Sequence, residues 1–156
     1  MDEKNLKFMK AAIKLAMKAE SMNEVPIGAV VVSDGKIIGR GYNKRESSQS
    51  ATAHAEITAI NKACKKLSSW RLDNAELYVT LEPCPMCAGA IVNARIKKVY
   101  FGAYEKKSGC ACSKHEILTD NGMNHKSDYE GGIMEKECSK LLKDYFKAKR
   151  AKNNLK

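Results

Sequence analysis

Apolar residues recur at a helical spacing near the start of the chain, and lysines fill the positions between them. The residues on this apolar face are Leu6, Met9, Ile13 and Met17. Steps of three and four residues predict an amphipathic helix that buries one face. Asp2 precedes the pattern and is a suitable N-cap, because its carboxylate can accept hydrogen bonds from the first free amides of the helix.

The next apolar run, at residues 25–32, is rich in β-branched residues and predicts a buried strand. An Asp-Gly pair follows at residues 34–35 and predicts a tight turn. We therefore expect residues 37–43 to return antiparallel beside the first strand. Residues 44–50 are polar, show no periodicity and predict a loop.

Helical spacing returns after this loop. The residues at steps of three and four are Ile57, Ile60, Cys64 and Leu67, and they predict a second amphipathic helix. We expect this helix to begin near Thr52, because the threonine hydroxyl can cap its free amides.

The chain then alternates again between strand and helix. Residues 77–81 predict a strand, and Pro85 favours the start of a short helix, since proline is preferred at the first helical position. Residues 99–103 predict a fourth strand. Residues 104–125 are irregular.

A final amphipathic helix is expected from about Met134 onward. Its apolar residues Leu141, Leu142 and Tyr145 are expected to anchor it to the core. Lysines and an arginine crowd its C-terminal end, which is a favourable place for positive charge even without a ligand.

Strands that alternate with helices indicate one α/β domain, expected to span residues 1–156. Helices that cover both faces of a single sheet give three layers. The opening hairpin makes the sheet mixed, with antiparallel strands first and parallel strands later. Open α/β sheets place their sites in loops that follow strand ends, and residues 54 and 84 both follow such loops.

The chain carries 28 lysines and arginines against 18 acidic residues, a formal net charge of +10. This excess is unusual for an enzyme of small metabolites and typical of a protein that meets phosphates. The start lacks the apolar segment of a secretory signal, and no apolar run reaches the roughly 18 residues of a membrane helix. We therefore expect a cytoplasmic protein without membrane contact, in which the six cysteines are metal ligands and free thiols.

One imidazole and two thiols stand at the starts of the two central helices. His54 begins the first, and Cys84 and Cys87 form a Cys-x-x-Cys pair at the second. Three ligands are typical of a catalytic zinc site, which leaves its fourth position to water, whereas a structural site uses four. Glu56 lies close to His54, and a carboxylate beside zinc can carry protons as general base and then general acid.

These residues predict one zinc ion per chain and a catalytic role for Glu56. The plainer interpretation is a buried histidine with two core thiols. In that case Glu56 only stabilises the dipole of its helix. The joint spacing of the four residues favours the zinc site.

The motifs at residues 54–56 (His-Ala-Glu) and 83–87 (Pro-Cys-Pro-Met-Cys) resemble those of the cytidine deaminase-like zinc enzymes. Residues 25–29 take part in the resemblance, which extends over nearly the whole chain. The turn at residues 122–125 (Gly-Met-Asn-His) and the basic stretch 145–147 narrow it to the bacterial tRNA-specific adenosine deaminases. The resemblance implies a five-stranded sheet with helices on both sides and a homodimer. It also implies hydrolysis of adenosine to inosine at the wobble position of a tRNA anticodon.

The resemblance and the basic final helix together indicate substrate contacts. The expected residues are Asn43, Ala55, Glu105, Phe146, Lys147, Lys149 and Arg150. Asn43 matches a substrate-contacting asparagine of the family, although an asparagine there can also simply end a strand. The basic residues are expected to hold phosphates that flank the target base, and Phe146 to stack or pack there.

The chain departs from the family pattern in two loops. Ser50 and Ala51 stand where the family commonly has Asp-Pro, and Glu105 stands where it has a shorter aspartate. Cys110 and Cys112 stand where small inert residues are expected. Cys110, Cys112 and His115 offer three candidate ligands for a second metal ion, but three such residues in a loop are common without a metal. Free thiols are the simpler interpretation.

Two other functions use the same residues. A deaminase of free guanine or cytosine has the same zinc motif and is distinguished by its substrate. A non-catalytic zinc module that binds RNA would have a fourth protein ligand and no need of Glu56. The net charge of +10 favours an RNA substrate over a free base.

Overall fold

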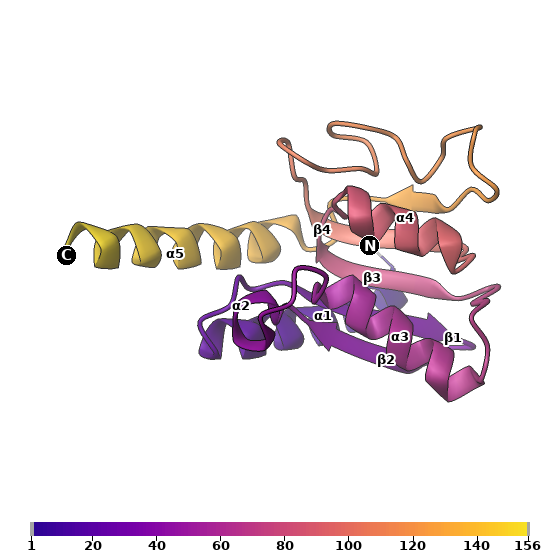
Figure 1. The fold of residues 1–156 in the computed structure, drawn as a ribbon, viewed down its shortest axis with the longest axis horizontal. Coiled ribbons are helices and arrows are strands. Elements are labelled where there is room, and N and C mark those ends of the chain that lie inside the picture. The colour runs from indigo at the N-terminus through magenta and orange to yellow at the C-terminus, as the bar shows by residue number, and fades with distance from the viewer. Residues whose placement is uncertain (1, 156) are drawn as a thin grey trace.

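The computed structural model describes residues 2–155, and their strands form one sheet with helices packed around it (Figure 1). The helices are α1 (Glu3–Ser21), α2 (Arg45–Ser48), α3 (Ala55–Leu67), α4 (Pro85–Asn93) and α5 (Glu135–Asn154). The strands are β1 (Gly28–Ser33), β2 (Lys36–Tyr42), β3 (Glu76–Leu81), β4 (Lys98–Ala103) and β5 (Asp128–Glu130). Of the helices in this part of the chain, none combines the length and the apolar character that a bilayer crossing requires.

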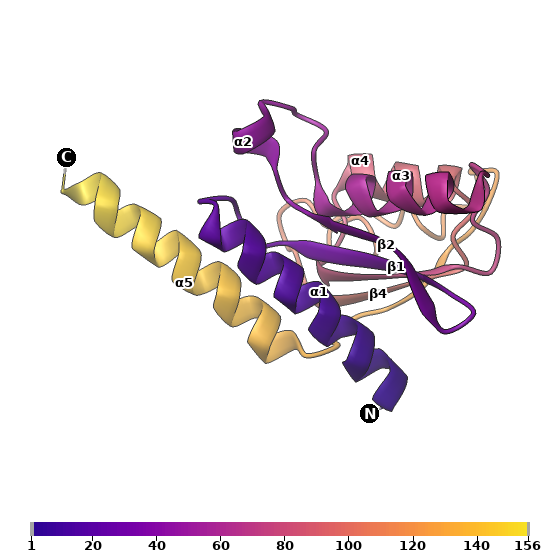
Figure 2. The ribbon, with the colours of Figure 1, turned by 90° about the horizontal axis from the view of Figure 1, so that it is seen from below.

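The five strands lie in the order β2-β1-β3-β4-β5. Strand β1 pairs antiparallel with β2 and β3, whereas β3, β4 and β5 run parallel to one another. Helices α3 and α4 cover one face of the sheet, and α1 and α5 lie against the other (Figure 2). The predicted three-layer α/β/α fold with a five-stranded mixed sheet is confirmed.

Each face of the sheet has its own hydrophobic core, because successive side chains of a strand point to opposite faces. Val31 and Val79 pack under the alanine-rich face of α3. Val30 and Tyr78 pack instead against α1, where Phe8 completes the contact. The valine run of β1 is therefore buried on both sides, as a central strand requires.

The first strand begins later than the apolar run predicted. Residues 25–27 are outside β1, which starts at Gly28. Their carbonyls bind Asn43 instead of a neighbouring strand: Asn43 donates its backbone N–H to Ile27 O at 3.0 Å and its side-chain amide to Val25 O at 3.4 Å. This segment thereby turns toward the loop that follows β2.

The prediction of a loop at residues 44–50 was wrong, because a short helix, α2, lies within it. The buried carboxylate of Glu24 accepts hydrogen bonds from the backbone amides of Glu46 (3.1 Å) and Ser47 (2.5 Å). An acceptor at these free amides stabilises a helix start. The acceptor comes from a distant part of the sequence, so no local pattern indicated the helix.

The predicted start of α3 at Thr52 was also wrong. Residues 50–54 form a tight turn in which the Thr52 hydroxyl lies 3.3 Å from that of Ser50, and the helix begins at Ala55 with His54 as its N-cap. His54 makes no side-chain capping bond. The first amides of α3 thus keep their positive potential for the space in front of the helix.

Helix α5 is anchored over less of its length than the apolar pattern predicted. Cys138 is its one buried residue, and Leu141, Leu142 and Tyr145 are only half-buried. Tyr145 donates a hydrogen bond to the carbonyl of Asn23 at 3.3 Å. Beyond this point the helix projects past the sheet, as both ribbon views show (Figures 1 and 2).

Strand β2 and helix α3 touch backbone to backbone, and we predict that Gly41→Ala lowers the free energy of unfolding by about 1–3 kcal/mol. A Cβ at Gly41 would lie 2.7 Å from the amide nitrogen of Ala59 and closer still to the carbonyl of Ala55. Denaturant unfolding measures the change. Gly89→Ala is the control, because no heavy atom lies within 4 Å of its added Cβ and alanine is a better helix former. Equal stability of Gly41→Ala and the parent chain would contradict the close approach.

Candidate active site

The starts of α3 and α4 bring one imidazole and two sulfurs together. His54 precedes α3, Cys84 precedes α4, and Cys87 lies in the first turn of α4. Both sulfurs lie 3.6 Å from Nδ1 of His54, and all three ligand atoms lie within 4.8 Å of one another. Within residues 2–155 this is the one group of histidine, cysteine or acidic side chains with metal-binding spacing. Nitrogen and sulfur donors in a His-Cys-Cys set suit a zinc ion.

Hydrogen bonds link the three side chains of this cluster. The pKa of Cys84 is lowered to about 4, first by a hydrogen bond from the Cys87 thiol and then by one from His54. The same contacts raise the pKa of His54, chiefly through Cys84, and raise the pKa of Cys87. Thiolate and neutral imidazole are the forms that bind metal, so a cation bound here would replace the protons of these hydrogen bonds.

Glu56 lies in the first turn of α3 and is 4% exposed. Burial raises the pKa of its carboxyl group to about 7, because the interior disfavours the charged form. Near neutral pH such a group exists in both protonation states. The structure therefore places a group able to take up and release a proton beside the His-Cys-Cys cluster.

A cavity of about 300 Å³ opens in front of His54 and Glu56. The residues that line it are Val25, Ile27, Asn43, Arg45, His54, Ala55, Glu56, Leu81, Tyr104, Glu105, Leu142 and Phe146. The lining is largely apolar, with a few polar groups at defined positions, as is usual for a small-ligand site. Of the predicted substrate residues, Asn43, Ala55, Glu105 and Phe146 are brought together here.

One wall of the cavity is formed by the segments around Val25 and Asn43. The side-chain oxygen of Asn43 accepts a hydrogen bond from the Arg45 amide at 3.1 Å, so the asparagine shapes this wall as well as lining it. Glu24, next to Val25, fixes α2 behind the wall. Burial alone would raise the pKa of Glu24, but its hydrogen bonds from Ser47 and Glu46 lower it, so Glu24 is held as a carboxylate.

A second wall is formed by Tyr104 and Glu105, at the start of the loop that follows β4. Glu82, which is 2% exposed, fixes this loop by accepting hydrogen bonds from its backbone amides. The donors are the amides of Glu105 (3.1 Å), Ala111 (3.1 Å), Cys112 (2.9 Å) and Ser113 (2.9 Å), together with the Ser113 hydroxyl. Burial opposes ionisation, but these bonds lower the pKa of Glu82.

The other predicted substrate residues lie outside the cavity lining. Lys147, Lys149 and Arg150 are exposed on the projecting part of α5, just beyond Phe146. Phe146 is 40% exposed and packs at an angle against Tyr145, so one side of its ring faces the cavity and another faces solvent. Lys149 also lines a separate cavity, together with Glu20 at the end of α1 and Asn23.

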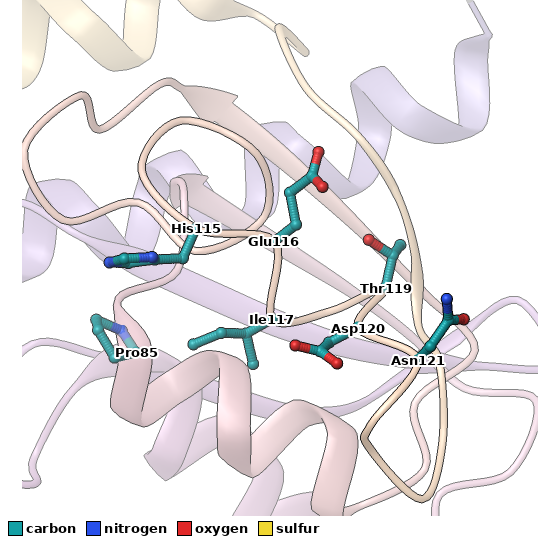
Figure 3. Close-up of a pocket in the computed structure, with 7 residues that line it drawn as sticks. All are labelled: Pro85, His115, Glu116, Ile117, Thr119, Asp120 and Asn121. Carbon is teal, nitrogen blue, oxygen red and sulfur yellow. The ribbon is translucent and has the colours of Figure 1, made fainter.

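A second cavity of about 660 Å³ lies over the start of α4 (Figure 3). Pro85 and the loop residues 115–121 line it, and His115 and Ile117 point toward Pro85 while Glu116 points away. His115 thus faces this shallow surface. Cys110, Cys112 and His115 do not form a metal-binding cluster within residues 2–155, and none of the six cysteines there forms a disulfide.

Several residues of the site were missed in the sequence. Arg45 and Tyr104 line the cavity with the apolar residues Val25, Ile27, Leu81 and Leu142, and Glu24 and Glu82 hold its walls. Glu82 carries the clearest sequence signal, because it directly follows the apolar run 77–81, and a charged residue beside a buried strand is almost never buried without partners. Glu24 follows polar residues and Arg45 lies in a polar stretch, so no local pattern distinguishes them.

The chain matches the family model described as MafB19-like deaminase over residues 3–150. It is 50% identical to the tRNA-specific adenosine deaminase of Bacillus subtilis over 145 residues, which are 93% of this chain and 90% of that protein. A solved structure from a study of A-to-I editing by tRNA:A34 deaminases is 43% identical, with a TM-score of 0.84 over 87% of this chain and 99% of that one. Guanine deaminase from Bacillus subtilis is 47% identical, with a TM-score of 0.62, over 67% of this chain and 66% of that one.

Proposed function

The chain belongs to the tRNA-specific adenosine deaminase family, and on that premise we propose that it hydrolyses adenosine to inosine at the wobble position of a tRNA anticodon. The observation that carries this proposal is the buried carboxyl group of Glu56 beside a His-Cys-Cys cluster, with Glu56 and His54 lining a cavity of about 300 Å³. Nucleobase deamination needs both groups in one site.

His54, Cys84 and Cys87 would hold one zinc ion per chain, since their donor atoms face one another and form the set that zinc prefers. Zinc, when bound, supplies a Lewis acid that makes hydroxide available at neutral pH. Cys84 lies at the N-terminus of α4, which favours its ligating thiolate form.

Glu56 would carry the protons of the reaction. Water adds to C6 of adenine and ammonia leaves, so one proton must reach N1 and another must reach the departing amino group. The raised pKa of Glu56, about 7, suits both uptake and release near neutral pH. Its burial keeps bulk water from competing for the proton.

The cavity walls would hold the target base after it leaves its stack. Val25, Ile27 and Leu81 present apolar surface to the ring, and Asn43 and Glu105 present polar groups to its edge. An unpaired anticodon loop lowers the cost of unstacking. Phe146 lies at the rim, where an aromatic ring can stack on a neighbouring base.

Lys147, Lys149 and Arg150 would hold phosphates beside the target nucleotide. They are exposed, lie one after another along α5 and add to the net charge of +10. The homodimer, the cytoplasmic location and a single deaminase domain over residues 1–156 are part of the same proposal and rest on the family resemblance.

A guanine deaminase is the second candidate, because a solved guanine deaminase is 47% identical to this chain. That similarity covers about two thirds of each chain, whereas the similarity to the tRNA deaminase of Bacillus subtilis covers 90% or more of both. A free base also carries no phosphate that the basic residues of α5 could bind. We therefore favour the tRNA substrate.

The zinc proposal predicts that Cys87→Ala removes bound metal. Loss of one of three ligands leaves a site too weak to retain zinc through dialysis. Elemental analysis of purified protein should find about one zinc per parent chain and little in the variant. Cys64→Ala, at a cysteine outside the cluster, should retain full zinc. Full zinc in Cys87→Ala would exclude the proposed ligand set.

The catalytic proposal predicts that the parent chain forms inosine in an anticodon stem-loop with adenosine at the wobble position. Glu56→Gln keeps the size of the side chain but cannot carry the proton, so the rate should fall about 10²–10⁴-fold with zinc retained. Inosine is read as guanosine after reverse transcription, which provides the measurement. Free guanine serves as the competing substrate. Deamination of guanine and not of the stem-loop would reverse the choice between the two candidates.

The role of α5 predicts that replacing Lys147, Lys149 and Arg150 by glutamine weakens stem-loop binding and flattens its salt dependence. Each phosphate contact on a single strand contributes about 0.7 to the slope of log K against log salt, so the slope should fall by about 2. The matched control replaces Lys62, Lys65 and Lys66, which are exposed on α3, and removes the same charge. Equal slopes in the two variants would show that only net charge matters.

A further inference from the structure

Glu82 is a buried carboxylate that the proposed chemistry does not use. Its oxygen Oε2 accepts three successive backbone amides, those of Ala111, Cys112 and Ser113. Its other oxygen, Oε1, accepts the amide of Glu105 and the hydroxyl of Ser113. One side chain thus joins both ends of the loop 105–113.

The loop packs directly on this carboxylate. A Cβ at Gly109 would lie 2.6 Å from Oε1 of Glu82 and would also meet the carbonyl of Glu105. The amide of Cys110 donates to the carbonyl of Pro83 at 2.8 Å, next to Glu82 in the chain. The backbone of the loop therefore lies against the segment between β3 and α4. This contact leaves no space for a side chain at Gly109.

Glu82 also lies between two parts of the site. It precedes Pro83 and Cys84 in the chain, so its backbone is continuous with the metal-binding cluster. Its side chain accepts a hydrogen bond from the amide of Glu105, which lines the cavity. Glu82 therefore connects the segment that leads to the cluster with the wall that carries Glu105.

We propose that Glu82 is a positioning residue that sets the Tyr104–Glu105 wall of the cavity at the correct distance from the His-Cys-Cys cluster, so that Glu105 meets the RNA. Glu82 touches neither substrate nor metal and acts through the backbone amide of Glu105. The proposal rests on the proposed function, because the wall is of use only if RNA enters the cavity.

Glu82→Gln tests this role because it weakens the hydrogen bond to Glu105 more than those to residues 111–113. If the oxygen of the new amide group takes the place of Oε2, it still accepts the three amides of residues 111–113. The NH₂ group then takes the place of Oε1, where it can donate to the Ser113 hydroxyl but faces the N–H of Glu105 as a second donor. The Glu105 end of the loop is released, and the other end stays fixed.

The direct measurement is hydrogen exchange of the Glu105 amide in the full chain. In Glu82→Gln this amide should exchange about tenfold faster or more, while the amides of Ala111 and Cys112 keep their protection. This readout needs no activity. Unchanged exchange at Glu105 would overturn the proposal.

The functional measurement is a double-mutant cycle on the zinc-loaded protein. Glu82→Gln should raise KM for the anticodon stem-loop by about tenfold, with a smaller effect on kcat and full zinc content. Glu105→Ala removes the side chain that the wall presents but keeps the amide that Glu82 binds. In that background Glu82→Gln should have little further effect on KM. Independent, additive losses would overturn the positioning role.

Two controls separate positioning from loss of stability. Ser127→Ala removes a buried hydrogen bond to the carbonyl of Ile96, away from the cavity, and should lower stability without changing KM. Glu24→Gln weakens the wall around Val25 and Asn43, so its effect on KM should be additive with that of Glu105→Ala. If Glu82→Gln does not fold, Gly109→Ala displaces the same loop from its other side and should show the same coupling to Glu105→Ala.

The outcomes also separate this proposal from the proposed function. A parent chain that forms no inosine in the stem-loop overturns the proposed function. An active parent chain with an additive cycle overturns only the role of Glu82. A coupling of Ser127→Ala to Glu105→Ala as large as that of Glu82→Gln would also overturn the role of Glu82, since any destabilised chain would then behave in the same way.

Discussion

The close approach of helix α3 to strand β2 is the constraint on which the rest of the site depends. The backbone of α3 lies directly on Gly39 and Gly41, with no side chain between them. The position of the helix fixes the depth of its first turn, where His54 and Glu56 lie. A helix held one side chain further from the sheet would carry both residues away from Cys84, which precedes α4. The metal-binding spacing is thus a product of how two helices pack on one sheet.

The sequence predicted the three-layer fold and the central site because those features depend on local patterns. Helical spacing, the Asp-Gly turn and the Cys-x-x-Cys pair each lie within a few residues. The errors fall where distant residues decide the local structure. Helix α2 depends on the carboxylate of Glu24, and residues 25–27 leave the sheet to bind Asn43. Strand β5 spans only Asp128–Glu130, too short for an alternating pattern, and only the family resemblance indicated a fifth strand.

Charge is distributed unevenly through this molecule. The outer surface is rich in lysine and arginine, and the net charge is +10. Three of its acidic side chains, Glu24, Glu56 and Glu82, are buried around the cavity. Their environments differ: backbone amides keep Glu24 and Glu82 ionised, whereas Glu56 lies where burial raises its pKa to about 7. The same residue type therefore supports the walls in two positions and can transfer protons in the third.

Both walls are held by carboxylates that bind backbone amides, and this has a consequence for sequence variation. An amide is the same whichever side chain its residue carries, so the exposed positions 106–108 of the loop can change without altering its path. Cys110 and Ala111 are constrained in another way, because their side chains are fully buried in the core. Gly109 is constrained most directly, because its missing side chain is what admits the carboxylate. The exposed face of the loop can thus diversify by single substitutions on an unchanged backbone, and a change in loop length, which moves the amides themselves, is the change that this arrangement resists.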